Sequence, residues 1–198
     1  MTTVYFIRHA QADFSVRDGR IRPLTGQGLA DTRLVTAYLS GKHIDAVYSG
    51  PFKRAVDTIK GFAGHYGFEI KLIEDFRERK SDSDMTRINR AEFTLFMERQ
   101  WDDFNYTFSD GECLAGVQKR NIAALEELLV QCREKYIVIG THGTALSTII
   151  QYYDRSYGFA DFMAMVDIMP WVVKMTFDKN KCAGIEKINL FAQPQEKK

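Results

Sequence analysis

Two histidines, far apart in the chain, each follow an apolar run typical of a buried β-strand. His9 comes directly after Val4–Ile7 and Arg8, and His142 follows the run Tyr136–Gly140 closely. In open α/β sheets, ligands bind beyond the carboxyl ends of the strands. The pattern therefore predicts that both imidazoles meet in one crevice beside a guanidinium, a site suited to chemistry on an anionic group.

The neighbours Arg8 and His9 have the chemistry needed for phosphoryl transfer. A neutral imidazole nitrogen is a competent nucleophile toward phosphorus and would form a phosphohistidine. The guanidinium could bind phosphoryl oxygens in a bidentate way. Its charge would also disfavour protonation of His9 and keep the nucleophile available near neutral pH. The alternative is a strand-end histidine that only hydrogen-bonds its own loop.

His142 and Gly143 stand between a strand and a predicted helix N-terminus. The main-chain N–H groups and the helix dipole favour an anion at such a place. Gly143 permits close approach of the backbone to that anion. His142 could then stabilise charge on a transferring phosphoryl group. The alternative is a histidine whose hydrogen bonds are simply satisfied at a strand end.

A second arginine and an acid complete the set of candidates. Arg54 lies at the start of a helix that again begins beyond a strand, where its charge opposes the helix dipole. This local cost favours a functional role for Arg54. A carboxylic acid near the leaving-group oxygen would supply its proton. The residues alone do not separate the five acids of one charged loop: Glu74, Asp75, Glu78, Asp82 and Asp84.

Strand and helix patterns alternate along the chain. Strand-like runs occur at 4–7, 44–48, 68–73, 136–140, 171–177 and 185–191, the last two joined by a turn at Lys179-Asn180. Helical patterns run from Thr25 to Ser40, from Pro51 to Gly67, over 86–101, from a Ser109-x-x-Glu112 capping box onward, and from Gly143 to Tyr153. Such alternation predicts an α/β fold with a mainly parallel sheet.

The chain is expected to form one domain, residues 1–198, with an insertion subdomain at about 76–110. This segment is dense in charge and then in aromatic residues, and it is expected to cover one end of the sheet. A later segment, 152–170, is rich in methionine and aromatic residues. It could line a substrate pocket, but ordinary core and loop packing is the favoured interpretation.

The composition is that of an ordinary globular protein. Of the 198 residues, 45% are hydrophobic, and the formal net charge of +1 provides no broad basic field for nucleic acid or an anionic membrane. No apolar run is long enough to span a bilayer, and the N-terminus is unlike a signal peptide. Three cysteines without C-x-x-C spacing are typical of free thiols, which favours a cytoplasmic protein. The oligomeric state stays open.

The chemical residues fall in a set of short motifs that resembles the histidine phosphatase superfamily, the phosphoglycerate-mutase-like group. The resemblance spans roughly residues 4–150, with the motifs in the family's order. They are Phe6-Ile7-Arg8-His9-Ala10, Leu24-Thr25-x-x-Gly28, Tyr48-Ser49-Gly50-Pro51-Phe52-Lys53-Arg54-Ala55-x-x-Thr58, Phe76-Arg77-Glu78, Gly111-Glu112 and Thr141-His142-Gly143.

The resemblance implies a three-layer α/β/α sandwich and phosphoryl transfer through a phosphohistidine. It places the nucleophile at His9 and the phosphate-binding arginines at Arg8 and Arg54. It also places the second pocket histidine at His142 and the proton donor at Glu78, so that the family match singles out one acid of the five.

The chain departs from the family pattern at several positions. Ala10 replaces the usual glycine after the nucleophile, and Ser15 stands where the family often has asparagine, although its hydroxyl could still donate a hydrogen bond to phosphate. Cys113 follows Gly111-Glu112 where serine is common. The Tyr- and Lys-containing elements of the true mutases are missing, which favours a phosphatase that acts on a small-molecule phosphate ester.

Two other functions remain as alternatives. One is a phosphoglycerate mutase, and the other is a module that binds a phosphate ligand without catalysis. No metal and no cofactor are expected, because Arg8, Arg54 and the two imidazoles can balance the phosphoryl charge. A two-histidine metal site would need further ligands at recognisable spacing, and the sequence shows neither H-x-x-x-H nor H-x-D.

Overall fold

The computed structural model describes residues 1–82 and 88–192, and its centre is a six-stranded sheet with the strand order β3-β2-β4-β1-β5-β6. The strands β1 to β4 run parallel to one another, whereas β5 is antiparallel to both β1 and β6. The predicted α/β fold with a mainly parallel sheet is confirmed. The strands are β1 (Thr2–Arg8), β2 (Ala46–Ser49), β3 (Ile70–Leu72), β4 (Tyr136–Thr141), β5 (Trp171–Asp178) and β6 (Lys181–Ile188).

The strand β1 lies at the centre of the sheet and is buried along its whole length. A strand covered on both faces needs an almost continuous apolar run, which Val4–Ile7 provides. Its partner β4 runs beside it in register, so that Arg8 lies opposite Thr141. The two strands therefore end level with each other, and the next residues, His9 and His142, leave the sheet at the same edge.

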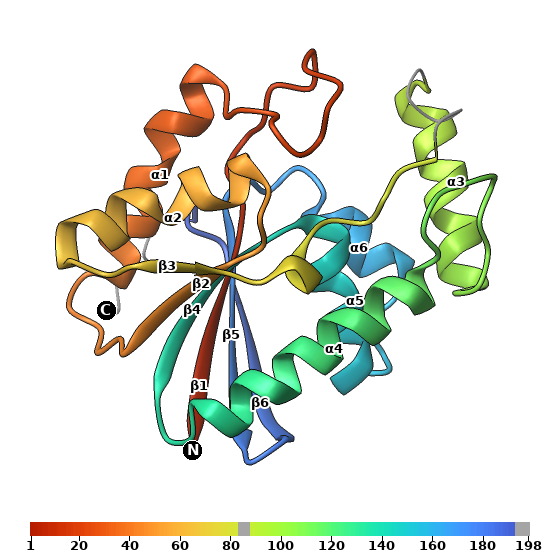
Figure 1. Ribbon diagram of the computed structural model, residues 1–198. Coiled ribbons are helices and arrows are strands. Elements are labelled where there is room, and N and C mark those ends of the chain that lie inside the picture. The colour runs from red at the N-terminus through yellow and green to blue at the C-terminus, as the bar shows by residue number, and fades with distance from the viewer. Residues whose placement is uncertain (83–87, 193–198) are drawn as a thin grey trace, which may run out of the picture.

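Helices cover both faces of the sheet, as Figure 1 shows, and the result is the predicted three-layer α/β/α sandwich. On one face α1 and α2 pack on Tyr5, Ile7 and Val47, and on the other α4, α5 and α6 enclose a larger apolar core. The helices are α1 (Gly26–Leu39), α2 (Lys53–Tyr66), the 3₁₀ turn η1 (Glu74–Phe76), α3 (Arg90–Asp102), α4 (Leu114–Gln131), α5 (Gly143–Tyr153) and α6 (Phe159–Met165).

Local sequence signals account for several helix ends. The Thr25 side chain accepts a hydrogen bond from the Gly28 N–H and caps α1. Gly67, in the left-handed region at φ 72°, ends α2. Asn89 and Glu92 form a capping box that begins α3. The helix predicted over 86–101 begins at Arg90 in the described residues, and positions 86 and 87 of the prediction lie outside them.

The capping box predicted at Ser109 and Glu112 is wrong. The helix α4 begins at Leu114, and Cys113 is its N-cap, with Sγ accepting from the Gly116 N–H at 3.4 Å. The Ser109 N–H instead donates to the buried Asp82 carboxylate at 2.6 Å. The Ser-x-x-Glu pattern therefore did not mark the start of the helix, because the Ser109 N–H binds the carboxylate of Asp82, which is distant in sequence.

The bounds of several other predicted elements also differ from the structure, among them the strand predicted over 44–48, which is β2. The last strand, predicted over 185–191, runs from Lys181 to Ile188, because it forms a hairpin with β5 through the predicted turn at Lys179 and Asn180. The strand β3 is limited to Ile70–Leu72 at the edge of the sheet. The helix predicted from Pro51 begins at Lys53.

The segment proposed as an insertion contributes to the main core. Phe96 and Trp101 of α3 are buried, and the Trp101 ring packs against Tyr157 and Phe162, with centroids 5.8 Å apart in both pairs. The segment 159–165, which gave no clear helical signal, forms the short helix α6, which lies near α3 (Figure 1). Of the helices in the described residues, none has the length and apolar character to cross a bilayer.

Candidate active site

The two predicted histidines meet where β1 and β4 end. Their ring centroids are 5.4 Å apart, and the residues are only 4% (His9) and 0% (His142) exposed. The main chain brings them together, because the His9 N–H donates to the Thr141 carbonyl at 3.0 Å. The structure thus places in one buried cluster two imidazoles that are distant in sequence.

The environment of His9 fixes its tautomer. The Nδ1 atom lies 2.7 Å from the carbonyl oxygen of Ala10, which can only accept, so that Nδ1 carries the hydrogen. Burial, together with the charges of Arg54 and Arg8, holds the pKa of His9 well below its ordinary value. The ring is therefore neutral at neutral pH, and Nε2 presents a free lone pair.

Ala10 and Thr58 secure the loop that carries His9. The Ala10 N–H donates to Thr58 Oγ1 at 2.9 Å, and the Thr58 hydroxyl donates to the Arg54 carbonyl at 2.7 Å. This chain of hydrogen bonds ties the end of β1 to the first turns of α2. Ala10 does not adopt a positive φ, so that alanine needs no glycine-like freedom here.

His142 is placed differently from His9. Neither of its ring nitrogens has a hydrogen-bond partner among the described residues, and the Phe52 ring packs edge-on at 5.2 Å. Burial is the main cause that lowers its pKa well below the ordinary value, and Arg54 and His9 add to it. A buried imidazole without a protein partner is available to a ligand.

The guanidinium of Arg8 is mostly occupied by the main chain. Nη1 donates to the Met165 and Ile168 carbonyls at 2.6 and 3.1 Å, and Nη2 donates to Val166 at 2.9 Å. Nε is buried and has no partner among the described residues, and Nη2 uses only one of its two N–H groups in these bonds, so that two N–H groups of Arg8 stay available to an anion. Burial lowers the Arg8 pKa to about 10.

Gly143 makes room for Arg8. A side-chain carbon at this position would lie 3.2 Å from Arg8 Nε and 3.3 Å from its Cζ. Contacts of this kind would push the guanidinium away from the helix N-terminus. The sequence suggested that Gly143 lets a ligand come close to the backbone. In the structure, Gly143 also leaves room for the Arg8 guanidinium.

Arg54 extends from the first turn of α2 into the same cluster. It is 4% exposed, its Nη1 donates to the Gly19 carbonyl at 2.6 Å, and its buried Nε has no partner among the described residues. Phe52 packs on the guanidinium at 5.2 Å. Burial lowers its pKa to about 10, and Glu78 acts in the opposite direction. Of the neighbouring charges, that of Arg54 contributes most to lowering the pKa of both histidines.

Glu78 lies against the N-terminus of α5. Its Oε1 accepts from the Arg79 and Ala145 N–H groups at 2.8 and 3.1 Å, and Oε2 accepts from the Thr144 N–H at 3.2 Å. Three main-chain donors therefore orient the carboxyl group at the end of the helix that begins directly after His142. Of the five acids open on sequence grounds, Glu78 is the one with this position in the described residues.

Ser15 is the candidate that the structure does not bring into the cluster. It is exposed, and its hydroxyl donates to the Asp13 carboxylate at 2.6 Å. Sequence reasoning gave no role to Thr58 or to Arg120, whose side chain holds the loop before Glu78. Thr58 and Glu112, the partner of Arg120, both lie in the family motifs of the sequence. Their place in these motifs was the only signal that could have pointed to them.

The two buried histidines predict that stability depends on pH. Because the pKa values of both histidines are lower in the folded protein, the unfolded chain binds more protons than the folded protein below about pH 6.5. The free energy of unfolding therefore decreases as the pH is lowered. Between pH 7.5 and 5.5 we expect a loss of about 1.4 kcal/mol per histidine, about 3 kcal/mol for both. Urea unfolding at the two pH values measures this, and His142→Asn should halve the difference. Equal stability at both pH values would contradict the burial of neutral imidazoles.

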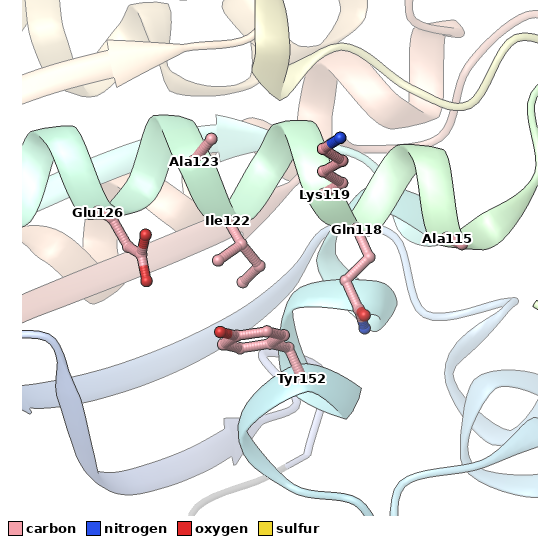
Figure 2. A pocket seen from close by; sticks show the side chains of 7 residues that line it. All are labelled: Ala115, Gln118, Lys119, Ile122, Ala123, Glu126 and Tyr152. Atoms are coloured by element: carbon pink, nitrogen blue, oxygen red, sulfur yellow. The ribbon is translucent and has the colours of Figure 1, made fainter.

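A surface groove lies apart from these residues. It is formed by α4 and by Tyr152 of α5, with Tyr152 across from Ile122 (Figure 2), and none of the candidate residues lines it. Within residues 1–82 and 88–192, no group of three or more His, Cys, Asp or Glu side chains is arranged to hold a metal ion.

Comparison with known proteins places the chain among phosphatases. Its sequence matches the histidine phosphatase superfamily (branch 1) over residues 4–166. Phosphoserine phosphatase 1 of Hydrogenobacter thermophilus is 27% identical over 154 residues, covering 72% of this chain and 71% of the relative.

Two solved structures share the fold. Bacillus stearothermophilus YhfR superposes with a TM-score of 0.74 at 22% identity, covering 92% of this chain and 94% of that one. Phosphoserine phosphatase from Entamoeba histolytica, in complex with 3-phosphoglyceric acid, gives a TM-score of 0.74 at 22% identity, covering 97% and 100%. At this identity, the two likenesses concern the fold.

Proposed function

The chain belongs to the histidine phosphatase superfamily and is a phosphatase, and from this we propose that it hydrolyses phosphomonoesters without a metal, through a phosphohistidine on His9. One observation carries the proposal. The Ala10 carbonyl holds the hydrogen on Nδ1 of His9, which leaves Nε2 as the nucleophile in a cluster with Arg8, Arg54 and His142. An imidazole of fixed tautomer beside unpaired N–H donors is suited to attack on an anionic phosphoryl group.

The reaction follows from these positions in two steps. Nε2 of His9 attacks phosphorus and forms the N–P bond, while the P–O bond to the leaving group breaks. Protonated Glu78 gives its proton to the leaving oxygen, and the product alcohol departs. Glu78 then takes a proton from water, whose oxygen attacks phosphorus, and the N–P bond breaks to release inorganic phosphate. The free Nε–H groups of Arg8 and Arg54, with His142, stabilise the phosphoryl oxygens.

The proposed substrate is a small phosphorylated metabolite, and phosphoserine is the first compound to test. Support comes from the relative named phosphoserine phosphatase 1. The experiment is a screen of phosphate release over phosphoserine, sugar phosphates, phosphoglycerates and nucleotides, with EDTA present throughout. Release from at least one metabolite in EDTA is the expected result, and activity that disappears with EDTA would contradict the metal-independent mechanism.

A trapping experiment separates the enzyme from the two other functions. Quenching a labelled substrate reaction in alkaline denaturant preserves an N–P bond, and mass spectrometry should find the phosphoryl group on His9. Binding without label or turnover would indicate a non-catalytic module. Conversion of 3-phosphoglycerate to its 2-isomer, rather than to inorganic phosphate, would indicate a mutase.

Replacing Glu78 by glutamine is expected to remove the proton donor while keeping the size and most hydrogen bonds of the side chain. Turnover of alkyl phosphates such as phosphoserine should fall by about 10²–10³-fold, because their leaving oxygens need the proton. Turnover of p-nitrophenyl phosphate should fall much less. Glu74→Gln, at an exposed acid of the same loop, is the matched control. Equal losses on both classes of substrate would count against Glu78 as the acid.

A further inference from the structure

Arg120 on α4 has every N–H of its guanidinium in use. Nε donates to Glu112 Oε1 at 2.7 Å, and Nη2 donates to Glu112 Oε2 at 2.8 Å and to the Glu78 carbonyl at 3.2 Å. Nη1 donates to the carbonyls of Asp75 and Arg77 at 2.6 and 2.8 Å. An arginine has five N–H donors, and all five are bonded here to one carboxylate and three main-chain carbonyls.

These carbonyls belong to the segment that carries Glu78. Arg120 binds this segment before and at Glu78, and Glu112 holds it just after, because the Lys80 N–H donates to Glu112 Oε2 at 3.3 Å. The Glu112 N–H also donates to the Lys80 carbonyl at 2.9 Å. Residues 75–80 are thus held on both sides of the proposed acid, by Arg120 of α4 and by Glu112, which lies just before α4.

The pair is well suited to hold a fixed geometry. The Arg120 and Glu112 side chains are 10% and 17% exposed, and the contact is bidentate, which restricts orientation as well as distance. Burial works against ionisation of Glu112, but Arg120, together with the Lys80 N–H and the charge of Arg77, holds the Glu112 pKa below its ordinary value. Arg120 is also close enough to help lower the pKa of His142.

We propose that Arg120 and Glu112 are positioning residues for the proton transfer, because they fix the main chain of Glu78 so that its carboxyl group stays at the N-terminus of α5. The inference rests on the proposed function of Glu78 as the acid. Glu78 then has two supports: the α5 N–H groups hold its carboxyl group, and Arg120 holds its carbonyl. Loss of the second support would leave the acid present but displaced from the leaving oxygen.

The test is Arg120→Lys, which keeps the charge but replaces a planar group with five donors by an ammonium with three. We expect kcat for phosphoserine, or for the alkyl phosphate found in the screen, to fall by roughly tenfold or more, as for a misplaced acid. For p-nitrophenyl phosphate the fall should be under about threefold, with KM little changed for either substrate. Arg133→Lys makes the same change at an exposed position and should change nothing.

A double mutant distinguishes a positioning role of Arg120 from a general loss of structure. If Arg120 acts through Glu78, then Glu78→Gln with Arg120→Lys should lose no more alkyl phosphatase activity than Glu78→Gln alone. Glu112→Gln, which weakens the pair without removing its size, should show the same split between leaving groups. This second variant carries the test if Arg120→Lys does not fold.

The possible failures are distinguishable. Without phosphorylation of His9 in the wild type, the proposed function fails. The positioning role alone would be overturned by equal losses on both substrates in the Arg120 and Glu112 variants, if the wild type forms phosphohistidine and Glu78→Gln shows the expected difference between substrates. Multiplying losses in the double mutant would overturn it as well.

Discussion

Replacing His9 by alanine is expected to reduce turnover by roughly 10⁴-fold or more, because the proposed reaction needs a bond between its Nε2 and phosphorus. The fold should remain, since His9 makes one side-chain hydrogen bond, to Ala10 of its own loop. The measurements are kcat on the screened substrate, the thermal midpoint and the phosphohistidine label. The label should disappear with the activity.

The matched control is His65→Ala, at an exposed histidine on α2. It should retain wild-type turnover and label. A His9→Ala variant that keeps more than about a tenth of the wild-type rate would show that a different nucleophile, such as water acting directly, performs the reaction.

Replacing Arg54 by methionine is expected to have the second largest effect, a fall in kcat/KM of about 10²–10³-fold. The change removes a buried charge that is proposed to bind the phosphoryl group and that lowers the pKa of both histidines more than any other neighbouring charge does. Its loss makes protonation of His9 easier, so that the His9 pKa rises. The acid limb of the kcat/KM profile should therefore move to higher pH.

Lys53→Met is the control for Arg54→Met. Lys53 is the preceding residue and pairs with Asp57 on the exposed side of α2, so that its loss removes the same charge outside the cluster. It should change neither the rate nor the pH profile by more than about twofold, as for an exposed ion pair. An acid limb that stays in place in Arg54→Met would contradict the electrostatic role of Arg54.

The parts of the fold that depend on local sequence were predictable. The apolar run Val4–Ile7 indicated a buried central strand, and Thr25 and Gly67 marked helix ends correctly. The Ser109 capping box failed because Asp82, 27 residues earlier, accepts the Ser109 N–H, and no local pattern records such a partner. The start of β6 was missed because its first residues are polar or small and give no strand pattern. They are in the strand because they pair with β5.

The candidate site was predictable as a set of residue types but not as a set of contacts. The sequence suggested that Arg8 binds phosphate, but it did not show that both Nη atoms also bind carbonyls of residues 165–168, which are more than 150 positions away in sequence. Residues 165–168 come close to Arg8 only in the folded protein, so no local sequence pattern indicates this contact. The surroundings of Arg120 are equally non-local, because its carbonyl partners carry no side-chain signal at all.

The hydrogen bond between His9 Nδ1 and the Ala10 carbonyl also bears on the lifetime of the proposed intermediate. When Nε2 carries the phosphoryl group and Nδ1 keeps its hydrogen, the ring is a cationic phosphoimidazolium. Water then displaces a neutral imidazole, which is a far better leaving group than the anion that a deprotonated ring would release. By keeping that hydrogen in place, one main-chain carbonyl favours rapid release of phosphate over a long-lived phosphoenzyme.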